Sequence, residues 1–308
     1  MTLSREKHLW TLGLLIALVV NLLLFPASSL AQDNSQGRYR PEGRQIGLAT
    51  GREFDERMYE VRTYEATPAS DAFTRAMVFY PLTLSFDPPN GAIAFVPGYQ
   101  ATPANYEWWG PALATLGYSV FILETNSPTD SLAARADALV AAIDFIKSEN
   151  QNADAPVNNK IDPNKIAIMG HSLGGGATMA AAATLGDDIA AAIPLALYCC
   201  ELGQSFSGDY SNVSAPTLVI AAAQDEIAPV ATHAKLVYDS IGSEKIYMEM
   251  AEGDHILVTN NGADKNTLGR FVLAFLKVHL DSRSNLVAHI TTPGADYADK
   301  FSRYETAP

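Results

Sequence analysis

The chain has 308 residues, of which 48% are hydrophobic and 18% charged, a balance that is ordinary for a globular protein. Its 34 acidic and 21 basic residues leave a formal net charge of −13 at pH 7. That charge disfavours nucleic acid or an anionic membrane surface as a partner, because both attract basic patches. The two cysteines, Cys199 and Cys200, cannot build a disulfide framework or a four-ligand zinc site. The fold must therefore depend on a hydrophobic core.

Residues 1–31 have the pattern of a secretory signal peptide. A basic start precedes a largely apolar run that ends at Phe25, and Ser29 and Ala31 occupy the small-residue positions of a peptidase site. We expect cleavage after Ala31 and a secreted or periplasmic protein with no stable membrane partner. An uncleaved anchor is the alternative, since the run is at the short limit for a spanning helix. Residues 32–55 follow as a polar linker.

Strand-like and helix-like segments alternate between residues 56 and 282, which predicts one α/β catalytic domain. The predicted strands are short apolar runs at 59–64, 76–80, 92–96, 119–123, 165–169, 190–196, 217–222 and 245–250. The predicted helices are at 106–116, 131–148, 174–185, 229–241 and 266–280. We expect a mostly parallel central sheet of about eight strands with helices on both faces, beginning with an antiparallel hairpin. Residues 283–308 form a polar C-terminal tail without an assigned element.

The segment from Lys165 to Gly176 carries the most informative pattern. A predicted strand runs into Gly-His-Ser-Leu-Gly at residues 170–174, and an Ala-rich helix follows directly. Gly-x-Ser-x-Gly between a strand and a helix is typical of a nucleophilic serine on a strained turn, whose neighbours must be small to avoid its side chain. The helix N-terminus faces the serine and favours an oxyanion there. We therefore predict Ser172 as the nucleophile, against the alternative of a bystander serine in a Gly-rich turn.

A serine nucleophile needs a histidine base that is oriented by a carboxylate. When the serine lies between a strand and a helix of a parallel sheet, the three residues follow along the chain in the order Ser, acid, His. Of the six histidines, only His255 stands in a loop directly after a predicted strand, where active sites of parallel sheets assemble. Asp225 ends the preceding strand, and Pro229 is suited to open the next helix. We predict His255 as the base and Asp225 as the acid. Other nearby acids are less well placed: Asp187, Asp188, Glu226 and Asp254.

The loop after the third predicted strand contains Pro97, Gly98 and Tyr99 and is expected to supply an oxyanion donor. We predict that the backbone N–H groups of Tyr99 and Leu173 form the oxyanion hole. Gly98 would let this loop approach the substrate closely. His171 precedes the nucleophile in the same turn, and its side chain should point away from the serine hydroxyl.

With these residues located, the chain resembles the bacterial cutinase and polyester (PET) hydrolase group of α/β-hydrolases over about residues 60–280. The resemblance rests on residues 97–99, 124–126, 166–176, 192–195, 215–219, 225–230, 233–234 and 253–255. It implies an α/β-hydrolase fold with an open surface groove and a Tyr99 ring that lines the acyl site. The 17 residues between Tyr198 and Pro216 leave no room for a large lid.

Several positions depart from the pattern of this group. Tyr198 stands where a tryptophan usually stacks on the substrate, so it is expected either as a substrate contact or as a buried aromatic side chain. The acidic calcium ligands of some relatives would fall on Ala223 and Ala251, and we expect no metal and no cofactor. Cys199 and Cys200 are either two free thiols or a vicinal disulfide.

Together these residues predict a monomeric serine esterase that hydrolyses carboxylic esters, small or polymeric, through an acyl-enzyme. A lipase or a dienelactone-hydrolase-like esterase acting on small soluble esters is the alternative within the class. An α/β-hydrolase that has lost catalysis and serves as a binding protein is the alternative outside it. The complete set of Ser, Asp and His in the expected order favours the enzyme.

Overall fold

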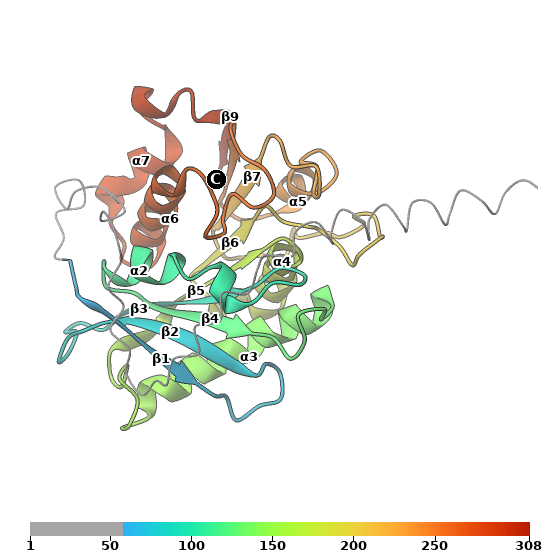
Figure 1. Cartoon of the computed structure of the whole chain (residues 1–308). Helices are drawn as coiled ribbons and strands as arrows, with labels where there is room; N and C mark the ends of the chain where they lie inside the picture. Colours follow the sequence, from blue (N-terminus) through green and yellow to red (C-terminus); the bar gives the residue numbers. More distant parts are fainter. Residues whose placement is uncertain (1–57) are drawn as a thin grey trace, which may run out of the picture. The chain divides into compact units, whose positions relative to one another are not determined.

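Nine strands form the sheet around which residues 58–308, the part that the computed structural model describes, are organised (Figure 1). Their order across the sheet is β1-β2-β4-β3-β5-β6-β7-β8-β9. The bounds are β1 (Val61–Ala66), β2 (Arg75–Pro81), β3 (Asn90–Val96), β4 (Ser119–Glu124), β5 (Ile161–His171), β6 (Ala191–Leu195), β7 (Thr217–Ala222), β8 (Lys245–Met250) and β9 (Phe301–Ala307). The predicted signal peptide at 1–31 and the predicted linker at 32–55 lie outside the described residues.

Six neighbouring strands of the sheet run parallel, in the order β4-β3-β5-β6-β7-β8. This confirms the mostly parallel sheet. At one end β1 and β2 form the expected antiparallel hairpin, and β2 pairs antiparallel with β4. All eight predicted strands are present within a few residues of their predicted bounds. A ninth strand, β9, is additional.

Helices cover both faces of the sheet, as predicted (Figure 1). The α-helices are α2 (Trp109–Ala114), α3 (Leu132–Gln151), α4 (Leu173–Leu185), α5 (Ala234–Ser240), α6 (Lys265–His279) and α7 (Val287–Thr291). Short 3-10 helices are at Pro103–Asn105, Gly186–Asp188, Ser284–Leu286 and Ala295–Tyr297. Side chains of α2, α6 and α7 pack in one hydrophobic core, and those of α3, α4 and α5 pack in the other. None of the helices within residues 58–308 is long and apolar enough to cross a membrane.

The central strands are apolar along their whole length because both of their faces are buried. In β3, Ile93 and Phe95 belong to one core, whereas Ala92, Ala94 and Val96 belong to the other. Successive side chains of a strand point to opposite faces, so a strand covered on both sides needs an unbroken apolar run. This burial fixes the carboxyl ends of the parallel strands at one edge of the sheet, where the predicted site residues follow them.

The predicted helix at 229–241 is shorter in the structure and begins only at Ala234. Pro229 does not open it. Its carbonyl instead accepts hydrogen bonds from the N–H groups of Thr232 and His233, which form a turn. The cause lies just upstream, because the Asp225 carboxylate accepts from backbone amides and folds the chain into a loop first.

The tail at 283–308, to which the sequence assigns no element, contributes α7 and β9. Strand β9 pairs antiparallel with β8 along its whole length, from Ala307 opposite Lys245 to Phe301 opposite Met250. Phe271 of α6 packs against the ring of Phe301, with the ring centroids 5.0 Å apart, and also against Tyr304. These contacts fasten the tail to the rest of the protein.

Candidate active site

Ser172 stands alone between the last residue of β5 and the first residue of α4. Its φ of 57° and ψ of −122° lie in a region that non-glycine residues rarely adopt, at a cost on the order of 1–3 kcal/mol. Backbone hydrogen bonds hold the turn: the Ser172 N–H donates to Leu195, and the Ser172 carbonyl accepts from Gly175, Gly176 and Tyr198. The predicted strained turn is therefore present.

The two glycines of the motif are required by nearby backbone atoms. From the sequence we expected them to make room for the serine side chain, and that reason is wrong. A Cβ on Gly170 would lie 2.3 Å from the carbonyl oxygen of Gly174. A Cβ on Gly174 would lie 2.5 Å from the carbonyl oxygens of Val96 and Pro97. Only glycine lets strand, helix and neighbouring loop approach this closely.

Two hydrogen bonds connect the three side chains that the sequence singled out. His255 Nε2 lies 2.7 Å from Ser172 Oγ, and His255 Nδ1 lies 2.7 Å from Asp225 Oδ2. A carboxylate can only accept, so Nδ1 carries the proton and Nε2 accepts from the serine hydroxyl. Asp225 follows β7 and His255 follows β8, so adjacent parallel strands bring the acid and the base together.

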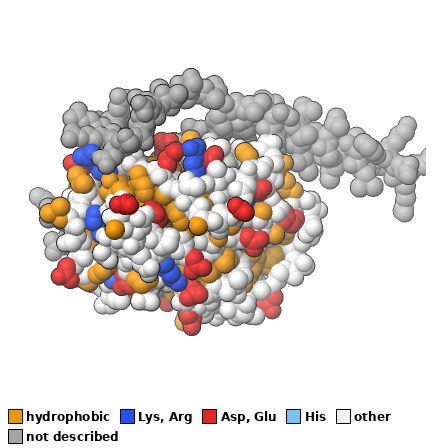
Figure 2. Space-filling model, turned by 90° about the horizontal axis from the view of Figure 1, so that it is seen from below, with side chains coloured by type: hydrophobic (Ala, Val, Ile, Leu, Met, Phe, Trp, Pro, Cys, Tyr) orange, Lys and Arg blue, Asp and Glu red, His pale blue; other side chains and the backbone are white. Residues whose placement is uncertain are grey.

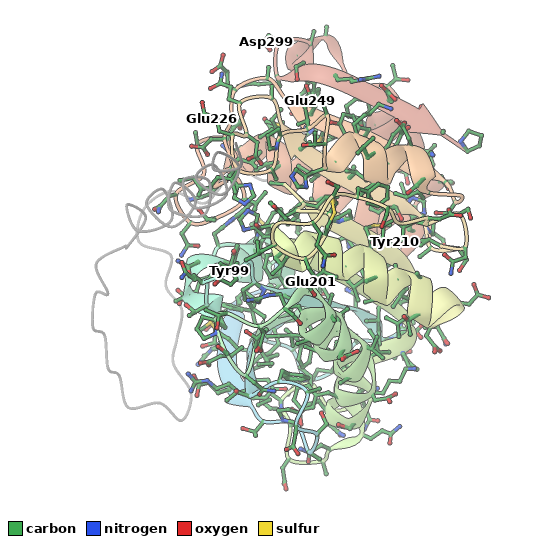
Figure 3. All side chains as sticks on the ribbon, turned by 90° about the vertical axis from the view of Figure 1, so that its right-hand side faces the viewer. Tyr99, Glu201, Tyr210, Glu226, Glu249 and Asp299 are labelled. Carbon is green, nitrogen blue, oxygen red and sulfur yellow. A yellow bond between two sulfur atoms is a disulfide. The ribbon has the colours of Figure 1, made fainter. Side chains whose placement is uncertain are left out.

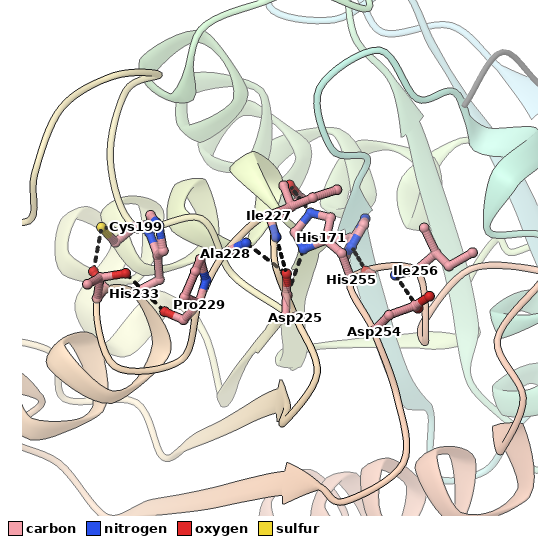
Figure 4. A network of polar contacts seen from close by, with 12 residues as sticks. His171, Cys199, Asp225, Ile227, Ala228, Pro229, His233, Asp254, His255 and Ile256 are labelled. Atoms are coloured by element: carbon pink, nitrogen blue, oxygen red, sulfur yellow. Dashed lines mark hydrogen bonds and ion pairs between the residues drawn. The ribbon is translucent and has the colours of Figure 1, made fainter. Parts of the chain in front are cut away.

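Asp225 has a hydrogen bond on each carboxylate oxygen. While Oδ2 accepts from His255, Oδ1 accepts from the N–H groups of Ile227 at 2.9 Å and Ala228 at 2.7 Å (Figure 4). Burial by itself would raise the pKa of Asp225, but these hydrogen bonds outweigh it and hold the pKa below its ordinary value. The carboxylate therefore stays ionised and oriented toward the histidine.

His171 uses both ring nitrogens away from Ser172, as expected. Its Nε2 donates to the backbone carbonyl of His255 at 2.8 Å, and its Nδ1 lies 2.7 Å from the hydroxyl of Tyr106. The Tyr106 hydroxyl in turn accepts from the N–H of Gly98 at 3.2 Å. Burial, with His255 nearby, lowers the pKa of His171 to about 3, so the ring is neutral. This buried chain links the loop of the base to the loop that carries Tyr99.

The loop that contains Tyr99 packs directly against the nucleophile turn, since a Cβ on Gly98 would lie 3.0 Å from the Ser172 Cβ. Gly98 therefore permits close approach to this turn. The amide of Gln100 donates to the Pro128 carbonyl at 2.7 Å. Among the described residues, the amide of Tyr99 has no hydrogen-bond partner.

Leu173 is the first residue of α4, and its N–H is one of those at a helix N-terminus that no carbonyl within the helix can satisfy. It too lacks a partner in the part of the chain that the structure describes. Two free N–H groups in the segments that flank Ser172, together with the positive end of the helix dipole, are what an oxyanion requires.

The loop after β6 forms another wall of the site. The half-buried Tyr198 stacks on His233, with the ring centroids 4.3 Å apart. Cys199 and Cys200 form a vicinal disulfide, which decides between the two predicted states, and no cysteine among the described residues is free. The N–H of Cys199 donates to His233 Nδ1 at 3.2 Å. His233 falls within the helix predicted at 229–241, but in the structure it is the residue just before α5.

Glu201 ties this loop to the start of α3 (Figure 3). Its two carboxylate oxygens accept from the N–H groups of Leu132 and Ala133, each at 3.1 Å. An acidic side chain at this end of a helix is stabilised by the helix dipole. The loop is thus held at Cys199, whose N–H bonds to His233, and at the start of α3.

Within residues 58–308, no group of three or more His, Cys, Asp or Glu side chains is arranged to hold a metal ion. Ala223 and Ala251, where some relatives of the predicted family carry calcium ligands, offer no side-chain oxygen.

Comparison with known proteins places the chain among ester hydrolases. The family model described as PET hydrolase-like matches residues 52–307. Cutinase est1 of Thermobifida alba is 35% identical over 216 residues, 69% of this chain and 67% of the relative. Cutinase 2 of Thermobifida cellulosilytica is 34% identical over 215 residues, 69% of this chain and 76% of the relative. Bis(hydroxyethyl) terephthalate hydrolase of Streptomyces coelicolor is 32% identical over 215 residues, 69% of this chain and 64% of the relative.

Proposed function

Because the chain belongs to the PET hydrolase-like family, we propose that it is a serine esterase that cleaves carboxylic esters through an acyl-enzyme. One observation carries the mechanism. His255 lies within hydrogen-bond distance of Ser172 through one nitrogen and of Asp225 through the other, each at 2.7 Å. This arrangement supports Ser172 as the nucleophile, His255 as the base and Asp225 as the group that orients it.

In the first half of the reaction, Ser172 Oγ attacks the ester carbonyl carbon while its proton moves to His255 Nε2. The ionised Asp225 stabilises the imidazolium that forms. The N–H groups of Tyr99 and Leu173 donate to the developing oxyanion. His255 then gives its proton to the leaving alcohol, and the acyl group remains on Ser172.

In the second half, His255 takes a proton from water, which attacks the acyl-enzyme carbonyl. The same two N–H groups stabilise the second oxyanion. When it collapses, the acid product leaves and the proton returns to Ser172.

For the substrate we propose an ester with a bulky or aromatic acyl group, including polyesters, held between the rings of Tyr99 and Tyr198. The relatives named as cutinases and as a bis(hydroxyethyl) terephthalate hydrolase support this choice. Small soluble esters are the second candidate, favoured by the smaller stacking surface of a tyrosine than of a tryptophan at position 198. A series of p-nitrophenyl esters of increasing acyl length, run beside a polyester film, distinguishes the two.

We also propose that the protein acts outside the cytoplasm as a monomer. The signal-like pattern of residues 1–31 supports export, with cleavage after Ala31.

The nucleophile is tested by Ser172→Ala with p-nitrophenyl acetate as substrate. We expect the rate to fall by several orders of magnitude, since loss of a nucleophile removes the acyl-enzyme route. The thermal unfolding midpoint should fall little, because the Ser172 hydroxyl makes its described hydrogen bond to His255 alone. Ser207→Ala changes an exposed serine in the loop after β6 and should keep the wild-type rate. More than about one per cent of the wild-type rate in Ser172→Ala would remove this residue from the mechanism.

A further inference from the structure

A fully buried arginine in α3 holds the loop that carries Tyr99. The guanidinium of Arg135 donates to three backbone carbonyls: Pro97 at 2.9 Å, Pro128 at 2.7 Å and Asp130 at 3.2 Å. Among the described residues it forms no ion pair with a carboxylate. Arginine suits this task because its planar fork presents several N–H groups in fixed directions. The guanidinium of Arg135 therefore holds backbone carbonyls in place and does not pair with a carboxylate.

Two of these carbonyls lie on either side of Tyr99. The Pro97 carbonyl belongs to the peptide whose N–H, that of Gly98, donates to the Tyr106 hydroxyl, so both ends of this peptide plane are held. The Pro128 carbonyl accepts from Arg135 and also from the N–H of Gln100. One side chain thus connects the anchors before and after Tyr99.

The backbone between these anchors is strained. Gln100 has a φ of 59°, in the left-handed region that favours glycine. A residue stays in such a conformation only where its surroundings determine it strongly. The N–H groups of Gly98, Gln100 and Ala101 are all bonded, so the strained loop leaves the Tyr99 N–H as its free donor.

We propose that Arg135 is a positioning residue for the oxyanion hole: it fixes residues 97–100 so that the Tyr99 N–H points toward the developing oxyanion. Arg135 acts through the backbone and does not itself bind the ester. The inference rests on the proposed function, and it assigns a role in the reaction to a residue far from Ser172 in the sequence.

The test compares Arg135→Met and Arg135→Lys with the wild-type protein on p-nitrophenyl acetate. Removing an oxyanion donor costs roughly 100–1,000-fold in kcat, and a donor that is present but misdirected should cost less. We expect Arg135→Met to lower kcat by about 10–100-fold with KM changed by less than about threefold. Arg135→Lys, which retains the charge and some of the hydrogen bonds, should lose about 3–10-fold. The midpoint of the pH profile of kcat should stay unchanged, because His255 and Asp225 are not touched.

A second readout separates positioning from general destabilisation. Phenylboronic acid adds to a serine nucleophile as a tetrahedral adduct, which mimics the transition state. Its affinity should fall in Arg135→Met by the same factor as kcat. The matched control is Ile146→Ala, which opens a cavity on the same helix. It should lower the unfolding temperature while kcat and boronate affinity remain at the wild-type level.

Folded Arg135→Met with kcat within about twofold of wild type would overturn the inference. So would a loss of kcat that Ile146→Ala shares. If Arg135→Met does not fold, Arg135→Lys decides by the same criterion. A wild-type protein without ester hydrolysis would instead overturn the proposed function, so the two failures are distinguishable.

Discussion

His171 is a buried side chain that contributes to the candidate site without belonging to the proposed triad. It is neutral, and its two nitrogens bond in opposite directions, to Tyr106 and to the His255 backbone. Burial lowers its pKa to about 3, whereas histidine in an unfolded chain titrates near 6.5. Unfolding therefore takes up a proton at any pH between these two values. Stability contributed by the neutral ring is complete above pH 6.5 and is lost as the pH falls toward 3.

We predict that His171→Gln weakens the pH dependence of stability. In the wild-type protein this one group should lower the free energy of unfolding by up to about 1.4 kcal/mol for each pH unit below 6.5. Glutamine does not titrate, so the variant should lack that contribution. Urea unfolding at pH 7, 6, 5 and 4 measures both slopes, and His289→Gln, which replaces an exposed histidine, is the control. Equal slopes in wild type and His171→Gln would mean that folding does not lower the pKa of His171.

At this scale the sequence predicts which three side chains lie together better than it predicts the residues that support them. Ser172, Asp225 and His255 each follow a predicted strand in the order the fold requires, and the structure brings their side chains together. Arg135 and Tyr106 could not be found in this way. Their roles arise from contacts with loops distant in the chain, and a helical arginine or tyrosine has no local signature for such a contact.

Among the elements, the loop after β6 is the one that we expect to influence substrate choice, because it carries Tyr198. Tyr198 stacks on His233, and the Cys199 N–H and the Glu201 carboxylate anchor the residues that follow it. Its ring is half-buried, so it is neither free nor locked inside the core. A larger ring at this position would extend the stacking surface.

We predict that Tyr198→Trp raises the rate on bis(hydroxyethyl) terephthalate several-fold and changes the rate on p-nitrophenyl acetate little. Aromatic stacking contributes about 0.5–1.5 kcal/mol, and the acetyl group is too small to use it. Tyr210→Trp, further along the same loop and away from Tyr99 in Figure 3, is the control and should alter neither rate. Equal losses on both substrates with a lower unfolding temperature would identify Tyr198 as packing.

Element boundaries depend on tertiary contacts that periodicity does not report. The strand at 217–222 is predicted to the residue, because a buried apolar run between Pro216 and a polar loop leaves little choice. The helix after Asp225 starts late because a carboxylate captures two amides first. Strand β9, with the sequence FSRYETA, lacks a clear alternation of apolar and polar residues. It becomes a strand by pairing with β8.

At the scale of the whole molecule, the alternation of segments was enough to predict the layers but not the order of the strands. In the chain β3 comes directly after β2, but in the sheet β4 pairs with β2, and β3 lies between β4 and β5. The net charge follows directly from the sequence, but the positions of the charges do not. In the structure, acidic side chains are scattered over the face shown in Figure 2 and are not gathered in one patch.

Strand β9 also decides which backbone the molecule presents to its neighbours in solution. It covers β8, whose middle residues Ile246, Tyr247 and Met248 are buried, and it carries the Arg303–Glu305 ion pair outward. Without β9, the apolar middle of β8 would be available to a second molecule with its N–H and C=O groups open. We predict that a variant ending at Asp299 self-associates at micromolar concentration in light scattering, whereas one ending at Ala307 stays monodisperse. If both variants scatter alike, β9 is not needed to prevent self-association. If only the variant ending at Asp299 scatters more, β9 keeps the protein soluble by covering β8.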